Sequence, residues 1–238
     1  MILSIHQPSY FPWLGMLDKI RQCDVFMVMD EVQLSDSAYQ HRNLLLTADG
    51  KPKFLTIPFV KRDYLKKPFR EIEIASPDWR VKHLNFIKNT YGKHPYAGEI
   101  IPRLEDFYAA DYRTLADAVV SSMRLSFEFF GIGARMIFQS EATYDRSLRR
   151  GDLVVALARA AGASCYLSGP GARAYLDESA FRGDPTLRYN NFRHPTYPQR
   201  CAHDFQSGLA CLDMLFNLGS NRSREMLVGA PEETRVAP

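Results

Sequence analysis

The chain opens with a short apolar run that leads directly into a proline-bounded turn and then into a helical pattern. Residues 1–5 are typical of a buried strand, and residues 8–15 hold two prolines and a glycine, which favour a turn. Apolar residues then recur at near-helical spacing between positions 13 and 23. This close succession of strand, turn and helix constrains the fold more than any other feature, because it favours an α/β architecture.

The sequence places His6 and Gln7 at the junction of this strand and turn. In open α/β sheets, ligands bind in the crevice beyond the carboxyl ends of the strands. One interpretation therefore makes His6 a ligand-binding or catalytic group. The other makes it a buried histidine that only hydrogen-bonds to the backbone, and the sequence leaves both interpretations open.

The composition indicates a globular chain and argues against several classes of protein. The 238 residues are 46% hydrophobic and carry a net charge of +3, which is too slight to imply nucleic-acid binding. No stretch approaches the roughly 18 apolar residues of a membrane span, and a basic leader region is absent, so we expect a cytoplasmic protein. The four cysteines form no C-x-x-C pair, which predicts reduced thiols, and the histidine spacing predicts no metal site.

Strand and helix patterns alternate along the rest of the chain. Strands are expected over residues 24–29, 135–139, 164–167 and 187–192, a hairpin over 44–47 and 53–60, and helices over 79–130, 151–161 and 208–218. This order predicts a three-layer α/β fold with a mostly parallel, Rossmann-like sheet, a small β-hairpin and a helical insertion at about 78–130. We expect one domain over residues 1–228 and a flexible tail over 229–238.

Polar residues follow several of the expected strands. Asp30 and Glu31 are adjacent, so they point to opposite faces and at most one of them serves the same site as His6. The turn over residues 168–171 is typical either of an anion-binding nest or of a tight structural turn. Residues 194–199 form a second proline-braced loop, and the basic residues 61–69 form either a solvated surface or a phosphate site.

These motifs leave proton transfer as the chemistry to consider. No G-x-S-x-G sequence supports an esterase-type serine, and Cys165 lies in an apolar strand pattern that does not suit a nucleophile. His6 or His194 remains as a general base, with Arg42 or Arg173 available to stabilise charge.

Segments along nearly the whole chain resemble the WbqC-like protein family. They are His6-Gln7-Pro8, Phe11 to Gly15, Asp18-Lys19-Ile20, Asp24-Val25-Phe26, Arg42-Asn43, Trp79-Arg80, Lys82-His83-Leu84, Tyr166 to Gly171, Tyr175-Leu176, His194-Pro195, Tyr197-Pro198-Gln199 and Leu212 to Asn217. Members of this family are associated with bacterial polysaccharide (O-antigen) gene clusters, and a glycine transferase role has been proposed for some. The resemblance implies an acyl or aminoacyl (glycyl) transferase or ligase that forms an amide with an amino sugar or similar small amine, in polysaccharide or secondary-metabolite biosynthesis.

The resemblance and the strand-end positions together nominate a site. The candidate catalytic residues are His6 and His194, and the candidate substrate-binding residues are Gln7, Tyr10, Asp30, Arg42, Asn43, Ser168, Gly169, Gly171, Tyr197 and Gln199. The implied partners are a small-molecule amine and an activated acyl or amino-acid donor, with a carrier protein as one source, and neither nucleic acid nor a membrane. The alternative is a non-catalytic protein that binds a nucleotide-sugar or scaffolds a biosynthetic complex.

A second similarity concerns ATP. Residues 6–15 and 167–175 are similar in placement to the ATP-handling segments of nucleotidyltransferase-like enzymes such as pantoate–β-alanine ligase, which activate a carboxylate by adenylation. The chain lacks the second histidine and the lysine of those segments. ATP with Mg²⁺ and a donor that arrives already activated, such as a thioester, therefore both stay open, and so does the oligomeric state.

Overall fold

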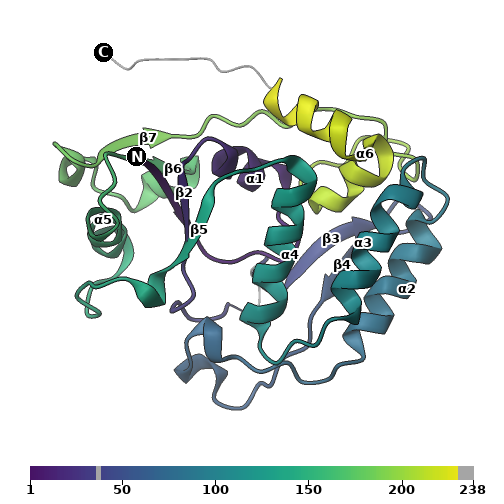
Figure 1. Cartoon of the computed structure of the whole chain (residues 1–238), viewed down its shortest axis with the longest axis horizontal. Helices are drawn as coiled ribbons and strands as arrows, with labels where there is room; N and C mark the ends of the chain where they lie inside the picture. The colour runs from purple at the N-terminus through teal and green to yellow at the C-terminus, as the bar shows by residue number, and fades with distance from the viewer. Residues whose placement is uncertain (36–38, 230–238) are drawn as a thin grey trace.

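The computed structural model describes residues 1–35 and 39–229, and it places a five-stranded sheet between layers of helices (Figure 1). The sheet strands are β1 Ile2–His6, β2 Val25–Val28, β5 Arg135–Phe138, β6 Cys165–Ser168 and β7 Thr186–Tyr189. They lie in the order β5–β2–β1–β6–β7, and every neighbouring pair is parallel. The predicted three-layer α/β fold with a mostly parallel sheet is therefore confirmed.

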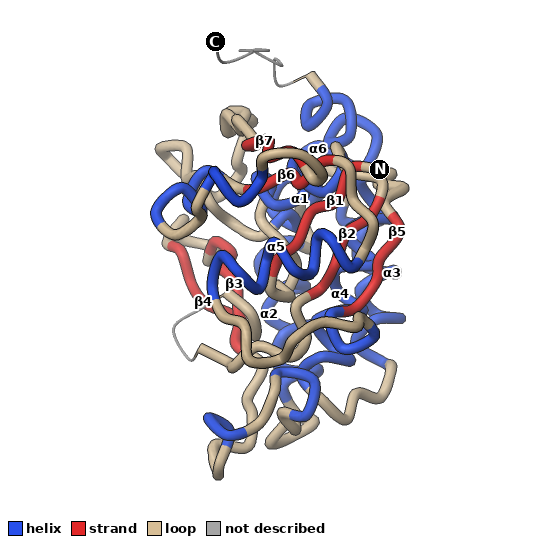
Figure 2. Tube along the Cα trace, turned by 90° about the vertical axis from the view of Figure 1, so that its left-hand side faces the viewer, coloured by secondary structure: helices blue, strands red, loops and turns tan. Residues whose placement is uncertain are grey.

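Helices cover both faces of the sheet because its central strands are apolar on both sides. The helices are α1 Leu14–Arg21, α2 Trp79–Tyr91, α3 Ala97–Ala109, α4 Leu115–Phe130, α5 Arg150–Ala160 and α6 Cys211–Val228. Figure 2 shows α5 crossing one face of the sheet, with α1 and α6 behind it. In β2, Val25 and Met27 pack in the cluster of α5, whereas Phe26 and Val28 pack in the cluster of α1, α4 and α6. All four side chains are buried, as expected of a strand inside a parallel sheet.

The predicted hairpin is confirmed as an antiparallel pair, β3 (Arg42–Leu46) and β4 (Pro52–Thr56). Its turn contains Gly50 at a φ of +78°, which glycine adopts without strain. The segment expected to be helical at about 78–130 forms α2, α3 and α4. Helices α2 and α3 pack against each other, whereas α4 contacts the sheet, where the rings of Phe26 and Phe127 are 6.1 Å apart.

Helix α6 continues past its predicted end at residue 218. Gly219 has a φ of +72° and a ψ of 170°, so the chain bends there and then forms a second helical segment. A side chain at this position would clash, because an added Cβ would lie 2.4 Å from Cδ1 of Tyr96. After the bend, Arg224 donates hydrogen bonds to the carbonyl oxygens of Glu128 and Phe129 at the end of α4. The predicted tail lies outside the described residues from position 230 onward.

The structure also bears on the cysteines and on membrane insertion. All four cysteines are free thiols. Burial raises the pKa of Cys23 to about 11 and that of Cys211 to about 12, so neither thiol ionises near neutral pH. Within residues 1–35 and 39–229, no helix combines the length and the apolar character that a membrane crossing requires.

Candidate functional site

The carboxyl ends of the sheet strands open into a cleft of about 1000 Å³. Strand β1 has β2 on one side and β6 on the other, so the strand order reverses at β1, and ligands of open α/β sheets bind at such a point. His6 and Gln7 line the cleft from the end of β1, Glu31 follows β2, Gln139 follows β5 and Tyr166 belongs to β6. The crevice expected beside His6 and Gln7 therefore coincides with a cavity.

His6 is a neutral imidazole whose outer nitrogen is available to a ligand. Its Nδ1 is 2.9 Å from the carbonyl oxygen of Gln7, and because that oxygen can only accept, Nδ1 carries the proton. No group in the described part of the chain hydrogen-bonds to Nε2, and the residue is accessible from the cleft. The protein atoms that surround the ring act by desolvation, and the positive charge of Lys19 adds to this; together they lower the pKa of His6 to about 4, although the residue as a whole is exposed to the cleft. At neutral pH, Nε2 is therefore a hydrogen-bond acceptor.

Basic side chains from two distant segments line the same cleft. Lys66 and Lys67 come from the loop before residue 68, and Arg146, Arg149 and Arg150 come from the segment that leads into and begins α5. Lys66 pairs with Asp63 at 2.9 Å, and Lys67 lies 4.0 Å from a carboxylate oxygen of Glu73. Both lysine side chains are exposed, so their ammonium groups remain available to a ligand. A cleft lined by charges of one sign attracts a ligand of the opposite sign. The cleft thus suits a phosphate or carboxylate group.

Arg150 also has an unusual backbone conformation. Its φ is +52°, a left-handed value that is uncommon for a residue other than glycine. The neighbouring guanidinium of Arg149 donates hydrogen bonds to the carbonyl oxygens of Arg146 and Leu148 at 2.6 and 2.7 Å, so this turn is held by its own side chain. Strained residues of this kind concentrate at functional sites. These residues are not among the predicted site residues, although three arginines within five positions, just before a predicted helix, are a signal that could have found this part of the cleft.

Of the adjacent carboxylates, Glu31 faces the cleft and Asp30 does not. The Asp30 carboxylate is buried and accepts hydrogen bonds from the backbone N–H and the hydroxyl of Ser140, at 2.9 and 2.6 Å. Glu31 accepts a hydrogen bond from Tyr144 at 2.8 Å and pairs with Arg146. Partial burial acts to raise the pKa of Glu31, but these partners outweigh it and hold the pKa below its usual value. Asp30 therefore joins β2 to the segment after β5.

Tyr10 and Asn43 support the loop behind His6. The side-chain amide of Asn43 donates to the carbonyl oxygens of Tyr10 and Phe11, at 3.1 and 2.8 Å, and Phe11 has a φ of +40°. The Tyr10 hydroxyl is buried between Nδ1 of His83 at 3.0 Å and the hydroxyl of Tyr108 at 2.6 Å. Neither candidate residue lines the cleft. Arg42, a third candidate, lies with its guanidinium 4.3 Å from the ring centre of Phe54.

Replacement of Asn43 by alanine is expected to lower the free energy of unfolding by about 2 kcal/mol, because two buried carbonyl oxygens lose their donor. Urea unfolding of the purified variant measures this loss. Asn85→Ala, on the exposed side of α2, is the matched control and should change the free energy by less than about 0.5 kcal/mol. Equal losses in the two variants would contradict the role assigned to Asn43.

The turn at residues 168–171 does not have the geometry of an anion-binding nest. Such a nest alternates right-handed and left-handed residues, yet neither Gly169 nor Gly171 has a φ in the left-handed region. Residues Pro170–Ala174 form a short 3₁₀ turn, and an added Cβ at either glycine would meet nothing within 4 Å. The Ser168 hydroxyl is buried and donates to the hydroxyl of Tyr166 at 3.4 Å. The geometry favours the structural interpretation of this turn.

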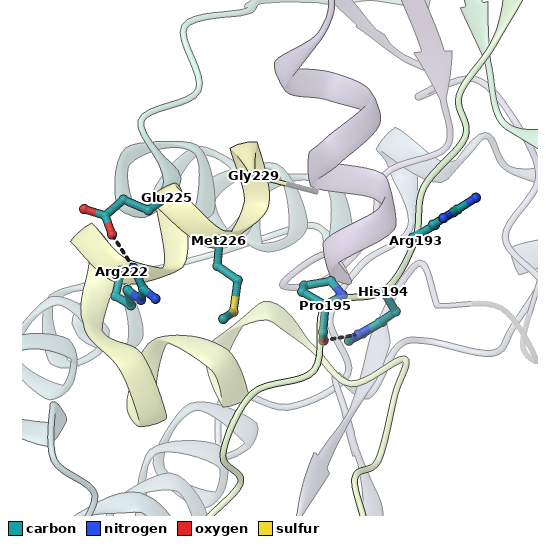
Figure 3. Close-up of a pocket in the computed structure, with 7 residues that line it drawn as sticks. All are labelled: Arg193, His194, Pro195, Arg222, Glu225, Met226 and Gly229. Carbon is teal, nitrogen blue, oxygen red and sulfur yellow. Dashed lines mark hydrogen bonds and ion pairs between the residues drawn. The ribbon is translucent and has the colours of Figure 1, made fainter. Parts of the chain in front are cut away.

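His194 lies away from the cleft of His6. Figure 3 shows it beside Pro195 at a shallow cavity of about 420 Å³, which Arg222 and Met226 also line. Its Nδ1 is 2.9 Å from the carbonyl oxygen of Pro195, and its Nε2 accepts a 3.3 Å hydrogen bond from the backbone N–H of Gly208. With both ring nitrogens bonded to the backbone, His194 offers no free lone pair to a substrate.

Tyr197 and Gln199 converge on a buried carboxylate, Asp213, at the start of α6. The Tyr197 hydroxyl donates to Asp213 Oδ2 at 2.9 Å, and Gln199 Nε2 donates to the same oxygen at 3.0 Å. The hydroxyl of Tyr91 donates to Oδ1 at 2.9 Å. Burial raises the pKa of Asp213, and the three hydrogen bonds offset part of this effect. These residues therefore form a buried network that holds the loop at 194–199 against α2 and α6.

Comparison with known proteins gives a family match over most of the chain. The profile of the WbqC-like protein family matches residues 7–225. The chain is also 26% identical over 228 residues to the uncharacterized protein Rv1507c of Mycobacterium tuberculosis, an alignment that covers 92% of this chain and 94% of the relative. The comparison with solved structures returned no significant match.

Proposed function

The chain belongs to the WbqC-like protein family, and from that starting point we propose that it is an enzyme that joins an acyl or aminoacyl group to the amine of a small anionic molecule. A phosphate-linked amino sugar of polysaccharide or secondary-metabolite biosynthesis is the acceptor that fits best. The cleft at the end of β1 is the proposed site, with His6 as its reactive group.

One observation carries this proposal: a neutral imidazole with a free Nε2 stands in a cleft lined by five basic side chains. The basic side chains would bind the phosphate or carboxylate of the acceptor by charge-assisted hydrogen bonds. Glu31 is the acidic side chain among the described residues that line the cleft, and its partners Arg146 and Tyr144 hold it. The side chains that line the cleft therefore carry a net positive charge, which favours an anionic ligand.

The proposed reaction is an addition followed by an elimination. The acceptor nitrogen forms a C–N bond with the donor carbonyl carbon, and this bond makes the nitrogen more acidic. Nε2 of His6 then takes a proton from that nitrogen, because the lowered pKa keeps the ring neutral and able to accept, and the protonated ring passes the proton on. The bond from the carbonyl carbon to the leaving group breaks, and the leaving thiolate or phosphate receives the proton. Gln7, which lines the cleft beside His6, would orient the carbonyl.

The test is an amide-formation assay that follows product mass. The purified chain is incubated with amino sugars, free or nucleotide-linked, and with acyl thioesters or with carboxylic acids plus ATP and Mg²⁺. We expect an amide product with at least one pair, and His6→Gln should lower its turnover by about 100-fold or more while the melting temperature stays within a few degrees. His194→Gln is the matched variant and should retain most of the turnover.

Two results would contradict the proposal. Full turnover in His6→Gln would remove His6 from the reaction. Saturable binding of a nucleotide-linked sugar with no amide from any pair would instead support a non-catalytic binding protein, because the basic cleft alone accounts for such binding.

A further inference from the structure

A second cavity of about 390 Å³ meets the cleft at His6 and Gln7, which line both. Its character differs from that of the basic cleft. Trp13, Met16 and Tyr39 contribute aromatic and apolar surface, and no lysine, arginine, aspartate or glutamate occurs among the described residues that line it. The reactive histidine therefore stands between a basic compartment and an apolar one.

The aromatic walls of this cavity are exposed to an extent that folding does not explain. Trp13 is 40% exposed and Tyr39 is 45% exposed, although large aromatic side chains contribute most to stability when buried. The indole of Trp13 is nevertheless held in place. Its ring meets that of Phe192 at 5.5 Å, and it lies over Gly15 so closely that an added Cβ would be 2.2 Å from its Cη2 atom. A fixed but uncovered indole is typical of a ligand-binding surface.

Gln40 adds a polar group on the same wall. This residue is only 2% exposed, and its Oε1 accepts a 2.8 Å hydrogen bond from the backbone N–H of Ser35. Its side-chain Nε2 has no hydrogen-bond partner in the described part of the chain. A buried donor without an acceptor is unfavourable, and this one lies behind the surface of the lining. The cavity therefore combines apolar walls with a buried amide residue in its lining.

We propose that this cavity binds the apolar acyl chain of the donor, with the donor carbonyl beside His6, while the basic cleft binds the anionic acceptor. The inference rests on the proposed function and specifies its donor. A glycyl group is small and carries an ammonium group, and none of the described residues that line the cavity offers a carboxylate to receive it. An alkyl or aryl acyl group fills the space and covers Trp13.

The test is calorimetric binding of the sodium salts of acetate, butyrate, hexanoate and octanoate to the full chain. Each methylene that enters an apolar site is expected to strengthen binding by about fourfold. Because every member of the series has the same carboxylate, the slope against chain length isolates the contribution of the alkyl chain. Trp13→Ala removes one wall, and Gly15→Ala displaces the indole without removing it. Each should weaken octanoate binding about tenfold.

Gly98→Ala in α3 is the control, because an added Cβ there meets nothing within 4 Å and lies in another part of the fold. Its binding series should match that of the wild type. Affinity that does not depend on chain length, or a slope unchanged in Trp13→Ala, would overturn the proposal. Chain-length-dependent binding with no amide in the assay above would leave the cavity assigned and refute the proposed reaction. Amide formation from glycyl donors only, at an unchanged rate in Trp13→Ala, would support the proposed reaction and refute the assignment of this cavity to an acyl chain.

Discussion

Asp213→Ala should lower the free energy of unfolding by about 3–5 kcal/mol. The carboxylate accepts hydrogen bonds from Tyr91, Tyr197 and Gln199. Alanine leaves the two buried tyrosine hydroxyls without this acceptor, whereas the Gln199 amide keeps its bond to the carbonyl oxygen of Gln206. The loop at 194–199 loses its attachment to α6 at the same time. For a domain of this size, such a loss corresponds to a fall in melting temperature of about 10 °C.

Urea unfolding followed by circular dichroism measures this effect. The matched control is Asp111→Ala, since the Asp111 side chain is 95% exposed and should change the free energy by less than about 0.5 kcal/mol. Should Asp213→Ala be too unstable to purify, Asp213→Asn keeps an acceptor oxygen and is expected to lose less. A loss below about 1 kcal/mol in Asp213→Ala would show that the network does not hold the loop.

The second large effect is a loss of stability in acid that depends on His83. Burial lowers the pKa of His83 to about 4, below the value of 6.5 that a histidine has when the chain is unfolded. Between pH 6.5 and pH 4 the unfolded state therefore binds more protons than the folded state, and stability falls as the pH falls. The shift from 6.5 to about 4 corresponds to a loss of about 3 kcal/mol. This contribution of His83 to the free energy of unfolding is fully present above pH 6.5.

His83→Gln isolates this contribution, because glutamine can still accept from the hydroxyl of Tyr10 but takes no proton. The variant should show a clearly smaller fall in unfolding free energy between pH 6.5 and pH 4 than the wild type. His203→Gln replaces an exposed histidine and should leave the pH dependence unchanged. Parallel curves for the wild type and His83→Gln would contradict the assignment.

The order of the elements could be predicted from the sequence, because apolar runs and glycine-bounded turns are local signals. The structure differs from these predictions where tertiary contacts override the local signals. Gly219 marks a helix end in a local pattern, yet the chain bends there and a second helical segment continues to Arg224 and beyond. Strand β7 ends at Tyr189, before the predicted end at 192, because β6 offers its last pairing at Ser168.

The residues of the candidate site also fall into two groups, those that local sequence signals could predict and those whose roles depend on tertiary contacts. His6 and Gln7 were predictable, since a strand end in an α/β fold is a local feature with a known position. Asn43 and Tyr197 resemble ligand-binding residues in sequence, but their partners are backbone carbonyls and a buried carboxylate that only the tertiary structure brings close. Arg146 and Lys66 reach one cleft from loops some eighty positions apart, and spacing within the sequence cannot reveal such a convergence.

The position of β1 inside the sheet has a consequence for how the chain folds. Its neighbour β6 is far along the chain, and the hydroxyl of Ser4 donates to the carbonyl oxygen of Leu167, 163 positions away. Closing so long a loop has a high entropic cost before any contact offsets it, so folding of such topologies is slow. Until β6 is synthesised, one edge of β1 has no partner and is a site for misassociation. An N-terminal fragment that stops before residue 165 therefore contains His6 but cannot assemble the crevice around it.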